Sequence, residues 1–97
     1  MAYMFAGCTA LTEVPIYNTS KVTSTGVQGT VGMIGMFIGC DNLSDESLNN
    51  IMQMCINATK ITNSTHKKLT YIGLSTTQIN TCKTLSNYQT LLDKGWT

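Results

Sequence analysis

The sequence predicts an α/β fold in which short stacked units of strand and turn are closed by a helical cap. The main observation is a repeat, because Met1–Thr12 matches Met33–Ser44 at a constant offset of 32 residues. The second is that apolar residues of the later half recur at helical spacing. A chain of 97 residues is one domain with a thin core. We therefore expect two repeats over 1–44 and a capping module over 45–97, ordered helix, strand, helix, helix.

Both copies of the repeat have the pattern Met-x-x-Met-Phe-x-Gly-Cys-x-x-Leu. The Met and Phe positions mark an apolar stripe on a short helical turn, and glycine permits a left-handed exit from it. The Cys and Leu positions then point back into a shared core. One unit cannot bury its apolar face alone, whereas stacked neighbours can. The structural positions of the repeat are therefore Met4, Phe5, Gly7, Cys8 and Leu11, then Met36, Phe37, Gly39, Cys40 and Leu43.

The stretch after the first copy, Leu11–Tyr17, alternates and contains β-branched residues, which predicts a short strand. Pro15 lacks an N–H donor and restricts this strand to an edge. Three glycines near 24–32 indicate an inserted surface loop between the two copies.

Ser44 can cap a helix whose first turn carries Asp45 and Glu46, where acidic groups complement the helix dipole. The apolar residues that follow recur at i, i+3, i+4 and i+7, which places on one helix face Leu48, Ile51, Met52 and Cys55. A polar loop separates this helix from Lys68–Leu74, whose alternation predicts a strand.

Two short helices are expected at the carboxyl end. Ser75 and Gln78 have the spacing of a capping box, and Ser86 and Gln89 repeat it. The third helix should run over 87–94 and end at Gly95, as glycine commonly follows a helix. The tryptophan after this glycine, Trp96, is expected to pack over the open end of the core.

Composition excludes several functions. Charged residues are only 11% of the chain and the net charge is +1, so there is no steering toward nucleic acid, anionic lipid or an acidic substrate. No apolar run reaches the length of about 18 residues that a membrane span needs. The N-terminus lacks the basic region of a secretion signal. We expect no nucleic-acid partner and no membrane insertion.

Catalytic chemistry is not indicated. His66 is the only histidine, and it lies in a polar loop beside lysines. The four cysteines contain no Cys-x-x-Cys pair, so buried thiols are expected, with one disulfide or a metal site as alternatives. The oxygen-rich stretch from Asp41 to Asp45 lacks the glycine and distal glutamate of a calcium loop, which favours a helix-capping turn. We therefore expect no enzyme activity, no cofactor and no metal.

The repeat, together with the Val-Pro and Asn-Thr-Ser-Lys-Val-Thr that follow its first copy, resembles the BspA-like leucine-rich repeats. These occur in bacterial surface proteins and in minor structural proteins of phages. The resemblance covers Met1 to about Ser44, and the second half is similar to the segment that often follows the last repeat. It implies a leucine-rich-repeat-like solenoid fragment of short strands and short helices with a C-terminal helical cap. The spacing of the copies departs from the family, whose unit is nearer two dozen residues.

The resemblance implies a non-catalytic binding or structural module of a phage virion, acting in host-surface recognition or particle assembly. The expected partners are other structural chains or a host-surface protein or glycan, and a homo-oligomer is also open. The alternatives are an adhesin of the bacterial cell surface and an accessory domain of a larger surface enzyme. Because the chain begins inside a repeat at Met1, we expect a fragment, or a second chain that covers this edge.

Overall fold

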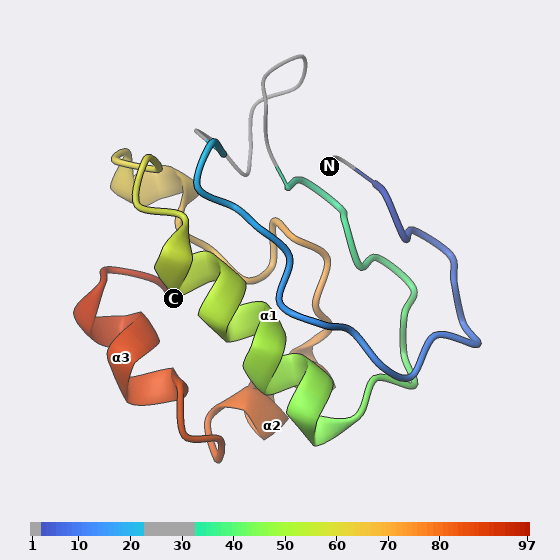
Figure 1. Ribbon diagram of the computed structural model, residues 1–97. Helices are drawn as coiled ribbons and strands as arrows, with labels where there is room; N and C mark the ends of the chain where they lie inside the picture. The colour runs from blue at the N-terminus through green and yellow to red at the C-terminus, as the bar shows by residue number, and fades with distance from the viewer. Residues whose placement is uncertain (1–2, 23–32) are drawn as a thin grey trace.

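Three turns lie side by side along one flank of the molecule (Figure 1). The computed structural model describes residues 3–22 and 33–97, so the expected glycine-rich insertion at 24–32 lies outside the described residues. The first turn spans residues 3–8, the second turn 33–40 and the third turn 68–74. Backbone hydrogen bonds join the first turn to the second and the second to the third. The two copies of the repeat are therefore stacked neighbours in space.

The predicted α/β class with leucine-rich-repeat strands is wrong, because the described residues contain helices and turns but no strand. The reason lies in the turn backbone. Within each turn, alternate N–H groups donate to the carbonyl three residues earlier, as Ala6 does to Tyr3 and Ile38 to Gly35. Only the remaining N–H groups reach the neighbouring turn. A chain that bends in this way cannot form the extended ladder of a parallel sheet.

The strand predicted over Lys68–Leu74 is wrong for the same reason. In this segment Tyr71 N–H donates to the Lys68 carbonyl and Gly73 N–H donates to the Thr70 carbonyl. Gly73 has a φ of 99°, which bends the chain back toward the core. Its alternating apolar side chains therefore belong to a turn, in which Leu69, Ile72 and Leu74 are buried.

The strand predicted over Leu11–Tyr17 is also absent, since this segment is hydrogen-bonded to a helix. Val14 N–H donates to Ser47 Oγ at 2.8 Å, and Asn50 Nδ2 donates to the Val14 carbonyl at 2.8 Å. Pro15 has no N–H to offer to a ladder. Side chains of a helix thus satisfy the backbone that a neighbouring strand would otherwise have paired.

That helix, α1 (Asp45–Asn57), confirms the prediction from sequence. Ser44 Oγ accepts a hydrogen bond from Ser47 N–H, and both Asp45 and Glu46 lie in the first turn. Its buried residues include the predicted apolar face and extend it with Ser47 and Met54. The first half of the chain covers one side of α1, and α2 and α3 pack against other parts of its surface (Figure 1).

The remaining helices are short: η1 (Ser64–His66), α2 (Thr76–Cys82) and α3 (Tyr88–Asp93). The capping box predicted at α2 is confirmed, since Ser75 and Gln78 exchange both hydrogen bonds. The one predicted for α3 is wrong, because its N-cap is Asn87 and makes no side-chain capping bond. Asn87 instead donates to Asn49, so α3 begins where it is tied to α1.

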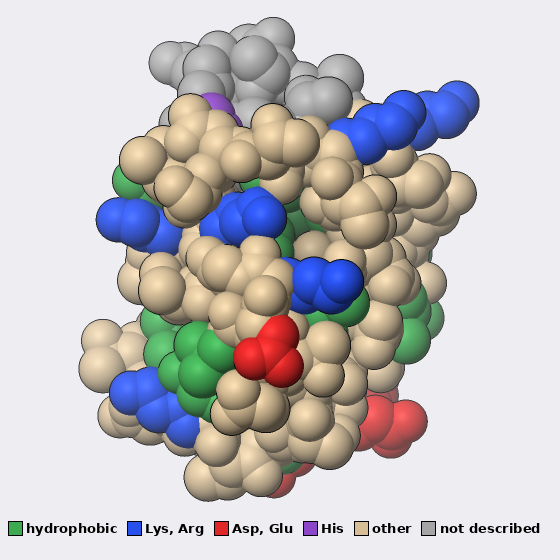
Figure 2. All heavy atoms as spheres, turned by 90° about the vertical axis from the view of Figure 1, so that its left-hand side faces the viewer, with side chains coloured by type: hydrophobic (Ala, Val, Ile, Leu, Met, Phe, Trp, Pro, Cys, Tyr) green, Lys and Arg blue, Asp and Glu red, His purple; other side chains and the backbone are tan. Residues whose placement is uncertain are grey.

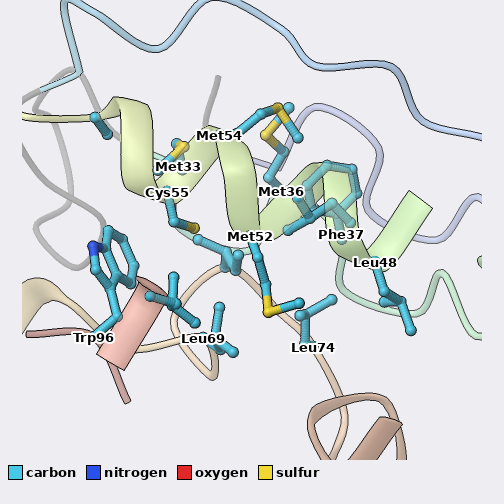
Figure 3. Close-up of a cluster of buried hydrophobic side chains, with 14 of the residues drawn as sticks. Met33, Met36, Phe37, Leu48, Met52, Met54, Cys55, Leu69, Leu74 and Trp96 are labelled. Atoms are coloured by element: carbon cyan, nitrogen blue, oxygen red, sulfur yellow. The ribbon is translucent and has the colours of Figure 1, made fainter. Parts of the chain in front are cut away.

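The end of α3 closes the core. Gly95 has a φ of 88°, and its N–H donates to Leu92 while Trp96 N–H donates to Leu91, which is a Schellman motif. This reversal buries Trp96, as predicted. Figure 3 shows Trp96 beside Leu69 and the side chains of α1. The core otherwise consists largely of methionine, leucine and isoleucine side chains from α1 and the second and third turns.

Candidate functional site

The two copies of the repeat differ in burial although they share a sequence. In the second copy Met36, Phe37 and Cys40 are buried, and Leu43 is half-buried against the core. Of the residues at matching positions, Met4 is 53% exposed and Cys8 is exposed, while Phe5 and Leu11 are half-buried. The second turn has a neighbour on each side. The first turn has a neighbour on one side only, so its outer edge faces solvent in the part of the chain that the structure describes (Figure 1).

The backbone of the first turn nevertheless matches that of the second. Gly7 and Gly39 have φ values of 78° and 77°, and Tyr3 and Gly35 have 56° and 63°. Each pair is separated by the 32 residues of the sequence offset. The left-handed exit predicted at the repeat glycine is therefore confirmed. Tyr3 is a non-glycine residue in this conformation, which costs it about 1 kcal/mol or more.

Close approach between turns explains the glycines. A Cβ on Gly35 would meet the Tyr3 ring, and a Cβ on Gly73 would lie 2.8 Å from Ile38 Cα. A Cβ on Gly39 would lie 3.4 Å from Gly7 Cα. A Cβ on Gly7 would meet none of the described residues within 4 Å. The stack is thus tight between its turns and open beyond the first turn.

Large apolar side chains are exposed mainly around this stack. Phe5 packs between two other rings, with centroid distances of 5.7 Å to Phe37 and 5.9 Å to Tyr17. Lys68 Nζ lies 5.6 Å from the Tyr71 ring centroid. We define the turn surface as the exposed apolar residues of this region, which are Tyr3, Met4, Ile16, Tyr17, Ile38 and Tyr71.

Charge is absent from the first two turns, since residues 3–11 and 33–40 contain no Asp, Glu, Lys or Arg. Figure 2 shows the face on the opposite side of the molecule, where several lysine side chains surround small apolar areas. The first two turns are therefore apolar and uncharged, whereas Lys68 lies over Tyr71 at the third turn and further lysines are spread over the opposite face (Figure 2). Contact with a partner at this surface would depend on burial and shape more than on electrostatic attraction.

The cysteines follow the expectation of buried thiols at three positions out of four. Cys40, Cys55 and Cys82 are buried, and all four thiols are free. Burial raises the pKa of Cys40 above its ordinary value and that of Cys82 to about 11. Burial also raises the pKa of Cys55, with a smaller contribution from Cys82. Cys8 departs from the expectation because the first turn has no outer neighbour to cover it.

The polar residues considered for chemistry have structural positions. Ser44 caps α1, and its Oγ lies 3.1 Å from Glu13 Oε2. His66 is at the end of η1 and half-buried. Among the described residues no group of histidine, cysteine and acidic side chains is placed to hold a metal ion, and no pocket is present. Of the helices described, none is long and apolar enough to span a membrane.

Comparison with protein-family models, curated proteins and solved structures gave no match. The candidate site therefore rests on the residues of this chain alone.

The sequence indicates Met4 as a repeat position and offers Tyr3, Tyr17 and Tyr71 as aromatic side chains that could stack on a glycan or protein, or lie half-buried, without defining a site. Ile16 and Ile38 were not singled out, and Ile38 occupies a position where the two copies differ. Aligning the two copies of the repeat could have indicated the position of Tyr3, because Tyr3 aligns with Gly35 and a glycine leaves room for the side chain of a neighbouring turn.

Proposed function

We propose that this chain is a non-catalytic binding and structural module that contacts protein partners through the turn surface. The observation that carries the proposal is that most of the exposed large apolar side chains belong to the three stacked turns and to the segment that follows the first turn. Among the described residues, seven large hydrophobic side chains are exposed; six belong to the turn surface, and the seventh is Leu92 on α3. Exposed large apolar side chains gathered on neighbouring segments are typical of interaction surfaces.

The character of the surface favours a protein partner. Half-exposed tyrosines such as Tyr3, Tyr17 and Tyr71 provide large contact areas at low entropic cost. The lack of charge in the first two turns supports neither nucleic-acid nor acidic ligands. The resemblance of the repeat further supports a place in a phage virion, in host recognition or particle assembly.

One experiment tests the location. Particles from the source culture are separated on a density gradient, and the tryptic peptide Leu69–Lys83 is followed by mass spectrometry. We expect co-migration with DNA-containing particles. Recovery in the bacterial cell envelope would contradict the virion and make the chain a cell-surface adhesin.

A second experiment tests the surface. The chain with Met4→Ser and Ile38→Ser is compared with Leu92→Ser, a variant of the exposed hydrophobic residue outside the turn surface. The double variant should bind the purified particles at least about tenfold more weakly, because two apolar side chains no longer become buried. Leu92→Ser should bind as the unaltered chain does. Equal binding by all three folded proteins would rule out the turn surface as the contact.

A further inference from the structure

The backbone hydrogen bonds between neighbouring turns all have the same direction. Tyr3, Phe5 and Gly7 donate their N–H groups to carbonyls of the second turn, at distances of 2.9, 2.9 and 2.7 Å. Gly35 and Phe37 donate in turn to carbonyls of the third turn, at 2.7 and 2.9 Å. In these backbone bonds every donor is in the earlier turn and every acceptor is in the later one. One side-chain bond runs the other way, from Cys40 Sγ to the Phe5 carbonyl at 3.0 Å. The outer edge of the first turn therefore presents acceptors.

Two of these acceptors can be identified from the offset of 32 residues. Phe5 and Gly7 donate to the carbonyls of Met36 and Ile38, whose counterparts in the first turn are Met4 and Ala6. No N–H or side-chain donor of the described residues reaches the carbonyl of Met4 or of Ala6. In the described part of the chain, the outer edge of the first turn therefore has two free carbonyls at the positions where the second turn accepts hydrogen bonds from the first.

The backbone shape of this edge also matches the edge of the second turn on which the first turn packs. The first turn packs against the second at Gly39, where an added Cβ would lie 3.4 Å from Gly7 Cα. Gly7 has the same φ as Gly39 to within a degree, yet a Cβ there would meet nothing within 4 Å in the part of the chain that the structure describes. The space beside Gly7 is therefore open and has the form that another glycine turn would fill.

A second copy of the described fold fits this edge less well than a separate turn does. Two first turns facing each other would bring carbonyls against carbonyls, which cannot form hydrogen bonds. Head-to-tail stacking would need free donors on the third turn. There, Leu69 N–H already donates to the Thr97 carbonyl, and Thr97 N–H donates to Lys67. The N–H groups of Tyr71 and Gly73 are used within the turn, which leaves those of Thr70 and Ile72, beside the edge with which Thr97 already pairs.

We propose that the outer edge of the first turn, at Met4, Ala6 and Gly7, docks in parallel a turn of the same Met-x-x-Met-Phe-x-Gly-Cys type from another polypeptide segment. The incoming turn donates two N–H groups to the carbonyls of Met4 and Ala6 and places its glycine beside Gly7. Its apolar side chains cover Met4, which is 53% exposed. This proposal rests on the proposed function and names the kind of partner.

The first test uses a peptide with the sequence of residues 33–44 as the incoming turn. It is titrated into the full chain labelled with ¹³C and ¹⁵N, and the carbonyl shifts are followed by NMR. Saturable shifts are expected at Met4 and Ala6. A peptide N-methylated at the amides corresponding to Phe37 and Gly39 has the same side chains but lacks the two donors. It should bind about tenfold or more weakly, because two hydrogen bonds are lost.

A matched pair of variants tests the contact at Gly7. Gly7→Ala adds a methyl group to the open space and should abolish peptide binding. Gly95→Ala is the control, because it introduces a similar backbone strain: φ is 88° at Gly95 and 78° at Gly7. Its added Cβ would contact the Lys67 side chain at 3.8 Å, away from the first turn. It should leave peptide binding unchanged. Thermal unfolding establishes that both variants are folded.

A free peptide loses translational and conformational entropy when it binds. The same twelve residues are therefore also joined ahead of Met1 by a flexible Gly-Ser linker. This tether raises their effective concentration to about millimolar. Shifts at Met4 and Ala6 in the tethered chain, removed by Gly7→Ala, support the proposal. Absence of these shifts in the tethered chain overturns it, and so does equal binding by the N-methylated peptide. Particle binding that survives such a result would leave the proposed function intact, since it depends on the exposed side chains.

Discussion

At the scale of the residue, buried polar side chains hold together segments that are far apart in the sequence. Ser47 Oγ accepts from Val14 N–H and donates to the Thr12 carbonyl at 3.1 Å. Gln78 uses its oxygen to cap α2 and its Nε2 to reach the Cys40 carbonyl at 2.6 Å. Of the buried side-chain polar atoms among the described residues, none is without a partner. Such bonds fix the register between the turns and the helices, since losing one partner leaves the other buried and unsatisfied.

The buried thiols predict a loss of stability at alkaline pH. Burial raises the pKa of Cys82 from 9.0 to about 11. Below pH 9 the thiol is protonated in both states and contributes no pH dependence. Between pH 9 and 11 the unfolded chain loses this proton while the folded chain keeps it, so the free energy of unfolding falls as pH rises.

This dependence is measured as the urea midpoint from pH 8 to 11 in the presence of a reductant. Cys82→Ala should give a shallower decline than the unaltered chain. Cys8→Ala changes an exposed thiol and should leave the slope as it is. Identical slopes in all three proteins would refute the assignment to Cys82.

At the scale of the element, the helices differ in what stabilises them. α1 has thirteen residues, an N-cap and an apolar face, which together specify a helix from local sequence. α2 and α3 have seven and six residues and are too short to be stable alone. Both pack on α1, and α3 is further tied to it by Asn49 and Asn87.

A capping substitution tests this difference. Ser75→Ala removes the hydroxyl that accepts from Gln78 N–H and should lower the free energy of unfolding by about 1 kcal/mol. Ser86→Ala should lower the free energy of unfolding by less, because Ser86 does not cap α3. Its side chain accepts one exposed hydrogen bond, from Asn49 Nδ2 at 3.4 Å. Urea unfolding followed by circular dichroism measures both. A larger loss for Ser86→Ala would contradict the capping assignments.

At the scale of the whole molecule, the chain is closed at one end and open at the other. Trp96 is buried beside Leu69, and the Thr97 backbone pairs with the third turn. The first turn forms the open end. The turn stack therefore has a direction: Trp96 and Thr97 cover its closed end, and the first turn presents backbone acceptors at its open end.

The closed end should be essential for folding. Trp96→Ala leaves a cavity and should lower the free energy of unfolding by about 3–5 kcal/mol, a large share of the stability of a small domain. Leu92→Ala, at an exposed position on the same helix end, should have an effect within about 1 kcal/mol. Urea unfolding followed by circular dichroism measures both. A cooperative transition of Trp96→Ala close to that of the unaltered chain would show that the closure is dispensable.

The sequence alone determined the local elements. The position of α1, the capping box of α2, the end of α3 at Gly95 and the burial of Trp96 were all predictable. Each depends on residues close together in the chain, such as a cap and the N–H three residues later. The sequence also gave the 32-residue register that aligns the first turn with the second.

Tertiary structure alone decided whether extended segments pair as strands and which side chains of the repeat are buried. Alternation at Leu11–Tyr17 and Lys68–Leu74 is compatible with a strand, but the hydrogen-bond partners of these backbones come from α1 and from within a turn. Met4 and Met36 have the same local sequence and opposite burial, because burial depends on the neighbour on each side of a turn. Local sequence specifies the shape of a turn, whereas the neighbours that cover it are set by contacts distant in the chain.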